Sequence, residues 1–255
     1  MEGLKGINKN IDEMIKNRIF NSGTVDAVLQ DNAILLNEKN INNFYKIPNI
    51  DRYNFKTLKN KRKLLYSNVK LYVNEKDDFY TKINNLLAFT SNLENIFPIS
   101  HQPNAIFYKN PDEYWWGGTE EMIITKGSDW CSEVARLFCA CSQLLEIPSR
   151  LVYTFGDNDG HVIAEIFDDN YWVLVDPLFN IIYAKDGKKY NSADIYRNKN
   201  IVDLFCGGYY CKSEFFKYIA ISEYYINESN KYDYSISYCN DYYRERLKKC
   251  WNGNG

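Results

Sequence analysis

The sequence predicts an α+β fold in which helices pack on an antiparallel β-sheet. A helical pattern of apolar residues runs over residues 130–145, and three short apolar stretches separated by turn-forming residues follow it. Helical patterns also occur earlier, over residues 7–19 and 78–97. Helices followed by a run of short strands are typical of the α+β class.

Length and composition place the chain among globular proteins. It has 255 residues, of which 45% are hydrophobic and 25% charged, which is enough to build a full core. The balance of 31 basic and 33 acidic residues indicates no general affinity for nucleic acid. The chain shows neither an 18-residue apolar run nor the apolar stretch of a secretory signal, so we expect a cytoplasmic protein without a membrane partner.

No repeat or low-complexity linker divides the chain, so we expect a single domain over residues 1–255. Within it we expect a helical N-terminal region (1–110), a core (111–185) and a C-terminal extension (186–255). Five basic residues lie between Lys56 and Lys63; they indicate a solvated helix face, and an anionic partner is the alternative. Paired tyrosines in the last third, Tyr224 and Tyr225 among them, are expected to pack in the interior.

The helix over residues 130–145 is expected to be buried and amphipathic. Ser128 and Asp129 are good caps for its start, and it stops before Pro148, since proline disfavours helical geometry in the preceding residue. Cys131 lies in its first turn, where free backbone N–H groups favour a thiolate. Cys139 and Cys141 lie further along and are expected to be small core residues.

The three strands are expected at residues 150–155, 161–167 and 171–176. If the second turn leaves an even number of loop residues, position 163 pairs with 176, and His161 and Asp176 share a face. Both faces of these strands are largely apolar, so we expect the sheet to be covered on both sides. Arg150 and Glu165 are expected to form an ordinary ion pair across adjacent strands.

Cysteine and histidine usage limits the possible chemistry. Seven cysteines, an odd number in mostly apolar surroundings, predict no disulfide framework. The spacings of Cys139-x-Cys141 and Cys206-x4-Cys211 match zinc sites poorly, so we expect no metal and no other cofactor. His101 lies in a probable loop and is expected to be exposed, which leaves His161 as the candidate base.

Three sequence blocks resemble the transglutaminase-like superfamily of papain-type cysteine enzymes. They are GSDWCSEVARLFCACSQLLEIPSRLVY, GHVIAEIF and YWVLVDP, which lie between residues 127 and 177, and the resemblance as a whole covers residues 117–177. The resemblance implies a papain-like core in which Cys131, His161 and Asp176 form a catalytic triad. Glu146 stands where the family often has glycine.

The implied reaction is acyl transfer from an amide through a thioester on Cys131. The substrate would be a peptide, protein or glycopeptide amide, and hydrolysis is the default outcome. The backbone N–H of Cys131 would bind the oxyanion together with an upstream side chain, Trp116 or Gln102, while Trp130 would wall the site. The alternatives are a catalytically silent scaffold that binds a peptide or protein, and a protein-crosslinking or deglycosylating amidase.

Overall fold

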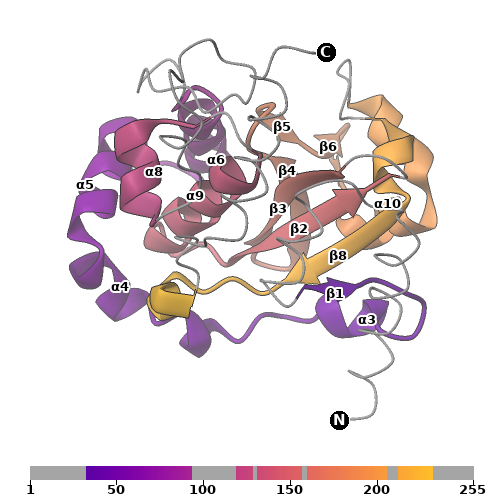
Figure 1. Ribbon diagram of the computed structural model, residues 1–255, viewed down its shortest axis with the longest axis horizontal. Coiled ribbons are helices and arrows are strands. Elements are labelled where there is room, and N and C mark those ends of the chain that lie inside the picture. Colours follow the sequence, from indigo (N-terminus) through magenta and orange to yellow (C-terminus); the bar gives the residue numbers. More distant parts are fainter. Residues whose placement is uncertain (1–32, 94–118, 129–130, 157–159, 206–211, 232–255) are drawn as a thin grey trace, which may run out of the picture.

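An antiparallel β-sheet forms the centre of the computed structural model, which describes residues 33–93, 119–128, 131–156, 160–205 and 212–231. Its six strands lie in the order β1-β8-β2-β3-β4-β5, and every neighbouring pair is antiparallel (Figure 1). The strands are β1 (Ile34–Leu35), β2 (Ser149–Phe155), β3 (Gly160–Asp168), β4 (Tyr171–Asp176), β5 (Ile181–Ile182) and β8 (Tyr218–Ser222). A separate hairpin pairs β6 (Ala184–Lys185) with β7 (Lys188–Lys189).

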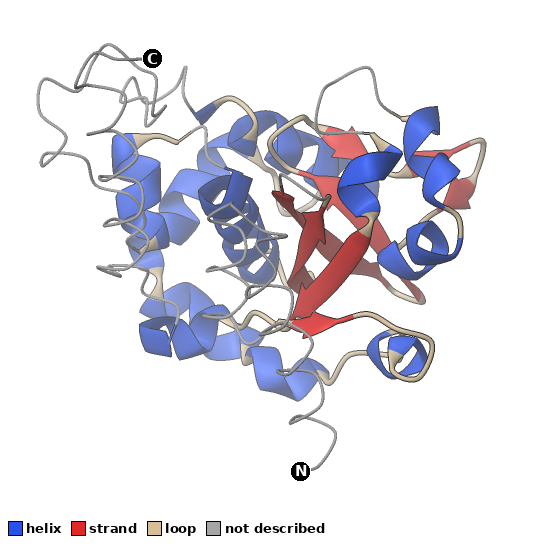
Figure 2. Cartoon of the chain, turned by 45° about the vertical axis from the view of Figure 1, so that its right-hand side comes forward, coloured by secondary structure: helices blue, strands red, loops and turns tan. Residues whose placement is uncertain are grey.

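Helices cover both faces of this sheet (Figures 1 and 2). One layer contains α4 (Phe55–Lys61), α5 (Lys63–Tyr72), α6 (Phe79–Thr90), α8 (Glu120–Lys126) and α9 (Cys131–Leu144). On the other side lie α3 (Ile41–Phe44), α10 (Ser192–Arg197) and the short 3-10 helices η3 (Lys199–Leu204) and η4 (Ser213–Phe216). Two further 3-10 helices are η1 (Ile50–Tyr53) and η5 (Ile226–Lys231). The α+β fold predicted from the sequence is confirmed.

The two faces of the sheet have separate apolar cores. Val162, Ala164 and Ile166 of β3 pack in a cluster with α9, whereas Ile163 packs in a second cluster with residues of α10, η3 and η4. This alternation is the period-two pattern of a strand that is buried on both sides. The prediction that the sheet is covered on both faces is therefore confirmed.

The register between β3 and β4 agrees with the expected pairing. Asp168 pairs with Tyr171 and Ala164 with Val175, so the turn contains two residues and position 163 lies opposite 176. Asp169 in this turn has a φ of 47°, in the left-handed region that two-residue hairpin turns use. The prediction that this loop has an even number of residues, which places His161 and Asp176 on the same face of the sheet, is confirmed.

One sheet takes strands from all three of the regions expected along the chain. β1 comes from the N-terminal region, β2 to β5 from the core region, and β8 from the C-terminal region. β8 lies between β1 and β2, where it pairs Ile221 with Val152. The N-terminal helix expected over residues 7–19 lies outside the described residues.

Helix α9 begins and ends close to the positions that the sequence predicts. At its start, the Ser128 hydroxyl donates to the Glu133 carboxylate over 2.5 Å and ties the preceding segment to the first turn. At its end, Glu146 has a φ of 64° and the Ile147 N–H donates to the Ser142 carbonyl. Glycine is common at this left-handed position after a helix, and in this chain Glu146 occupies it.

Helix α6 is shorter than the pattern over residues 78–97 predicts. Asp78 caps its start by accepting from the Thr81 N–H, as expected of an N-cap, but the helix ends at Thr90. The Thr90 and Ser91 hydroxyls donate back to carbonyls of the preceding turn, a competition that disfavours continuation. Residues 94–97 lie outside the described residues.

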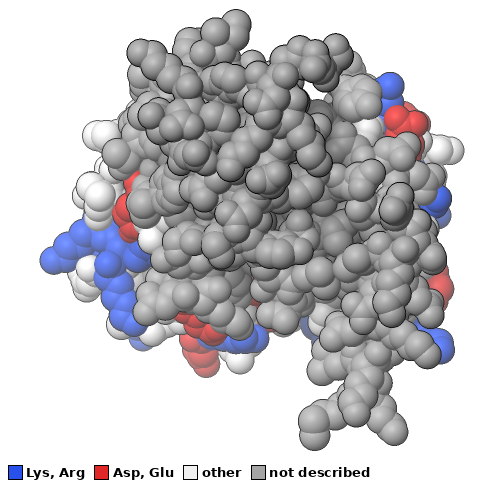
Figure 3. Space-filling model, in the orientation of Figure 1, with Lys and Arg blue, Asp and Glu red and all other residues white. Residues whose placement is uncertain are grey.

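The basic stretch in α4 and α5 is a solvated face only in part. Lys56, Lys61 and Lys63 are exposed, and Figure 3 shows Lys and Arg side chains gathered on the side of the molecule where α5 lies. Arg62, however, is largely buried against two glutamates, and Lys59 pairs with Glu75 over 2.6 Å. The expectation was wrong for these two residues because their partners come from distant segments.

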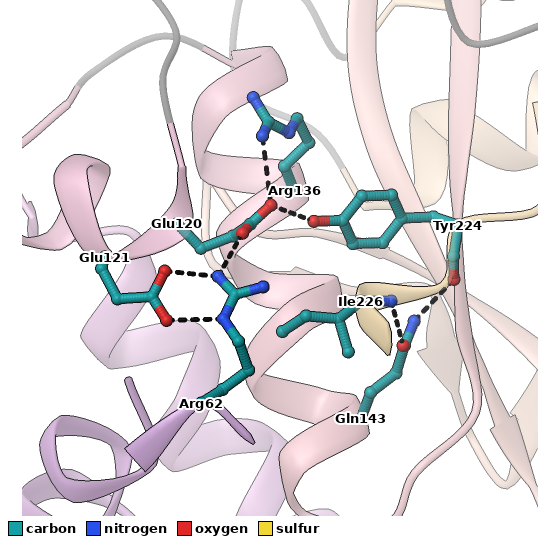
Figure 4. Close-up of polar contacts among 7 residues, drawn as sticks. All are labelled: Arg62, Glu120, Glu121, Arg136, Gln143, Tyr224 and Ile226. Carbon is teal, nitrogen blue, oxygen red and sulfur yellow. Dashed lines mark hydrogen bonds and ion pairs between the residues drawn. The ribbon is translucent and has the colours of Figure 1, made fainter. Parts of the chain in front are cut away.

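Glu120 is the centre of a buried network that joins the helical layer to the end of the sheet (Figure 4). Its carboxylate accepts from Arg62 over 2.5 Å, from Arg136 of α9 over 3.1 Å, and from the Tyr224 hydroxyl. Burial raises the pKa of Glu120, but Arg136 and Arg62 outweigh it and hold the pKa below its usual value. Glu121 also pairs with Arg62, so two carboxylates balance two guanidinium groups.

A neutral side chain supports the same junction. The Gln143 amide of α9 donates to the Tyr224 carbonyl over 2.7 Å and accepts from the Ile226 N–H over 3.0 Å (Figure 4). Tyr224 and Tyr225 are buried, as the sequence predicts for them. Helix α9 is therefore held to the segment after β8 through both Arg136 and Gln143.

Within the described ranges, no helix is long and apolar enough to span a bilayer.

Glu120→Gln is expected to lower the free energy of unfolding by about 3–5 kcal/mol, since it leaves buried guanidinium charge without its counterion. Urea denaturation at neutral pH measures the change. The matched control is Glu121→Gln, the same substitution at the next residue, whose side chain is more exposed and contacts Arg62 alone in this network. Equal losses in the two variants would contradict the central position of Glu120.

Candidate active site

His161 and Asp176 form a buried pair at the ends of neighbouring strands. His161 is the second residue of β3 and Asp176 the last of β4. Nε2 of the imidazole lies 2.8 Å from Oδ2 of the carboxylate, and the exposed fractions of the two residues are 2% and 0%. This hydrogen bond orients the ring and leaves Nδ1 for another partner.

The Asp176 carboxylate is itself held in place by the turn that follows β4. Its Oδ1 accepts from the backbone N–H of Leu178 over 3.0 Å and from that of Phe179 over 3.1 Å. Three hydrogen bonds thus satisfy the buried carboxylate, as burial of a polar group requires. The sequence indicates such a turn through the Pro177 that follows the strand.

Cys131, the first residue of α9, is the third member of the group. Burial alone lowers the pKa of His161, but the Asp176 carboxylate and the Cys131 side chain raise it to about 10. Because the Cys131 side chain contributes to this shift, its sulfur lies beside the imidazole. The fold thus brings together the three residues that the sequence singles out.

Cys131 differs from the other described cysteines in its surroundings. It is partly exposed, whereas Cys139 and Cys141 are fully buried in the core between α9 and the sheet, as expected. Burial raises the pKa of both core thiols well above the ordinary value, which keeps them protonated and unreactive. Among the described residues, no three His, Cys, Asp or Glu side chains form a metal-binding group.

Arg150 and Glu165 form the ion pair that the sequence predicts, on neighbouring positions of β2 and β3. Nε of Arg150 donates to Glu165 over 2.7 Å, and both side chains are buried. Glu165 also accepts from the Tyr45 hydroxyl and from the Ser192 N–H at the start of α10. The Arg150 guanidinium lies 3.9 Å from the centroid of the Trp172 ring. These contacts assign the pair to holding α3 and α10 against the sheet.

Several residues that the sequence singles out lie outside the described residues. These are the candidate oxyanion or wall residues Gln102, Trp116 and Trp130, and His101. Their roles therefore stay predictions.

Phe179 is a residue of this site that the sequence analysis did not single out. Its ring centroid lies 5.4 Å from that of His161, and its backbone N–H holds Asp176. The available signal was its position three residues after Asp176 in a turn, because a tight turn folds such a side chain back toward the strand end.

The comparison with known families agrees with the resemblance. Residues 96–177 match the family model described as the transglutaminase-like superfamily. The matched segment contains Cys131, His161 and Asp176, and it begins 31 residues before Gly127, where the first of the resembling blocks begins. No curated protein and no solved structure gives a significant match to the chain.

The raised pKa of His161 predicts a pH dependence of stability. A group with a higher pKa in the folded than in the unfolded state contributes its stabilisation fully below the unfolded value, and the contribution disappears as pH rises through the folded value. We therefore expect the stability advantage of the wild type over His161→Gln to fall between pH 6.5 and about 10. The loss should be on the order of a few kcal/mol.

Urea denaturation of both proteins at a series of pH values measures this difference. NMR titration of the imidazole protons tests the same pKa directly, since the chain has two histidines and His101→Gln assigns their signals. A difference in stability that stays constant across this pH range would contradict the proposed ion pair.

Proposed function

We propose that this chain, whose residues 96–177 carry a transglutaminase-like core, is a cysteine enzyme that cleaves a peptide-type amide through a thioester. The observation that carries the proposal is the contact of Cys131 with His161, whose Nε2 is held by buried Asp176. A nucleophile, a base and an orienting carboxylate in this order are the parts that covalent acyl transfer requires.

The first half of the reaction forms the thioester. The Cys131 thiolate attacks the carbonyl carbon, a carbon–sulfur bond forms, and one electron pair of the carbonyl moves to the oxygen. When this intermediate collapses, the carbon–nitrogen bond breaks and the nitrogen takes the proton of the His161 imidazolium. The amine leaves as a neutral molecule, and His161 is left as neutral imidazole.

The second half releases the acid. Neutral His161 accepts a proton from water as the water oxygen attacks the thioester carbonyl. The carbon–sulfur bond then breaks, the acid departs, and the thiolate and imidazolium are restored. We propose water rather than a second amine as the acceptor, because water requires no additional binding site.

The oxyanion that forms in both halves needs hydrogen-bond donors. We propose the backbone N–H of Cys131 as one donor, since the first N–H groups of a helix have no partner within it. Trp116 and Gln102 remain the candidates for the second donor. The position of Cys131 at the start of a helix thus favours the negative charge on its sulfur and also provides an N–H donor for the oxyanion.

Limited alkylation tests the proposed nucleophile. With a limiting amount of iodoacetamide, Cys131 should react roughly tenfold or more faster than the other six cysteines, because the thiolate is the reactive form. His161→Ala should remove this lead, and peptide mapping of the labelled protein measures it. His101→Ala is the matched control and should leave the labelling unchanged.

Equal labelling of Cys131 and the core cysteines in the wild type would contradict the proposal. The same holds if Cys131 keeps its lead without His161. Either result would favour a catalytically silent scaffold that binds a peptide or protein partner.

A peptide pool tests the choice between hydrolysis and amine transfer. A digest of casein is incubated with the wild type and with Cys131→Ser, with and without monodansylcadaverine, and analysed by mass spectrometry. We expect products that carry added water in the wild type alone. Dansyl-labelled products that exceed the hydrolysed ones would instead show a transferase.

A further inference from the structure

The turn after β4 places one apolar side chain next to the candidate catalytic pair. Phe179 follows Asp176 by three residues, and Asn180 after it has a φ of 55°. The hydrogen bonds from the Leu178 and Phe179 N–H groups to Asp176 fix the course of this turn. The position of the Phe179 ring is thereby set by the carboxylate that also orients His161.

The Phe179 ring lies beside the imidazole and still reaches the surface. Its centroid is 5.4 Å from that of His161, with the two planes tilted by 41°, and the residue is 40% exposed. His161 and Asp176 are buried, whereas part of the neighbouring Phe179 side chain is exposed to solvent.

The Phe179 side chain is less buried than the core residues near it. Leu178, the preceding residue, packs against the core between α9 and the sheet. Phe179 is a member of neither core cluster formed by the described residues. A large aromatic ring that stays 40% exposed gains only part of the free energy that full burial would give.

Phe179 and Cys131 contact the same imidazole. Both residues also reach the surface, Cys131 in part and Phe179 to 40%. We infer that a group whose carbonyl lies at the Cys131 sulfur would also lie near this ring. Apolar and aromatic side chains are the groups that gain most from contact with an aromatic face.

We propose that Phe179 is a specificity-determining residue that contacts an aliphatic or aromatic side chain of the substrate beside the amide that is cleaved. This inference rests on the proposed function and adds the substrate class to it. Polar or acidic side chains at that position would lose water on binding and gain no partner from the ring.

Two alkylating probes test the proposal without knowledge of the natural substrate. Iodoacetamide and N-benzyliodoacetamide both transfer their carbon to the Cys131 sulfur with loss of iodide, and they differ in one apolar ring. The rate for each at Cys131 is divided by its rate with N-acetylcysteine, which corrects for intrinsic reactivity. The wild type should prefer the benzyl probe by about three- to tenfold.

Three variants distinguish the loss of a contact between Phe179 and the probe from a loss of folding. Phe179→Ala should reduce the ratio of the benzyl rate to the iodoacetamide rate to about one, whereas Phe179→Leu, which keeps an apolar side chain, should retain part of the preference. Tyr72→Ala is the matched control, because Tyr72 on α5 is also an aromatic residue stacked on a neighbouring ring and 38% exposed. It should keep the full preference, and circular dichroism checks that each variant is folded.

The outcomes distinguish this inference from the function on which it rests. An unchanged benzyl preference in Phe179→Ala overturns the inference, as does an equal slowing of both probes, which would place the effect on His161 instead. In both cases a fast iodoacetamide reaction at wild-type Cys131 leaves the proposed function standing. A slow iodoacetamide reaction at Cys131 would overturn the function itself.

Discussion

The Glu120 carboxylate accepts hydrogen bonds from the largely buried Arg62 guanidinium, from the buried Arg136 guanidinium and from the buried Tyr224 phenol, and the placement of α9 depends on it. Arg62 comes from the junction of α4 and α5, Arg136 from α9, and Tyr224 from the segment after β8 (Figure 4). Burying these charges is costly unless each has its partner, so the segments must meet in one arrangement. The first residue of α9 is Cys131, and its position is a consequence of that arrangement.

A second buried ion pair acts on the opposite side of the sheet. Arg150 and Glu165 join β2 to β3, and through Tyr45 and Ser192 they also hold segments that lie before β2 and after β4 in the chain. β3 contains Glu165 in its middle and His161 at its start. The strand that presents the imidazole is anchored by an ion pair as well as by its apolar neighbours on both faces.

The parts of this fold that were predictable from the sequence are those set by local patterns. The 3.6-residue period marks α9, and the two-residue turn after Asp168 decides that His161 and Asp176 share a face. The strand β8 was missed, because five residues of ordinary composition acquire their position by pairing with β1 and β2 far away in the chain. Arg62 was interpreted as solvated for the same reason, since its carboxylate partners lie almost 60 residues further on.

The candidate site combines a buried pair with an accessible nucleophile. Asp176 has three hydrogen-bond donors, two of them backbone N–H groups of a turn that is fixed whether or not His161 is charged. This satisfied carboxylate can hold an imidazolium in the interior, where an unpaired cation would lose its proton. Because His161 and Asp176 are buried, a substrate of the proposed enzyme would meet the group at its two surface members, the Cys131 sulfur and the Phe179 ring. The same turn therefore determines the charge of the base and the chemical character of the surface against which an acyl group would bind.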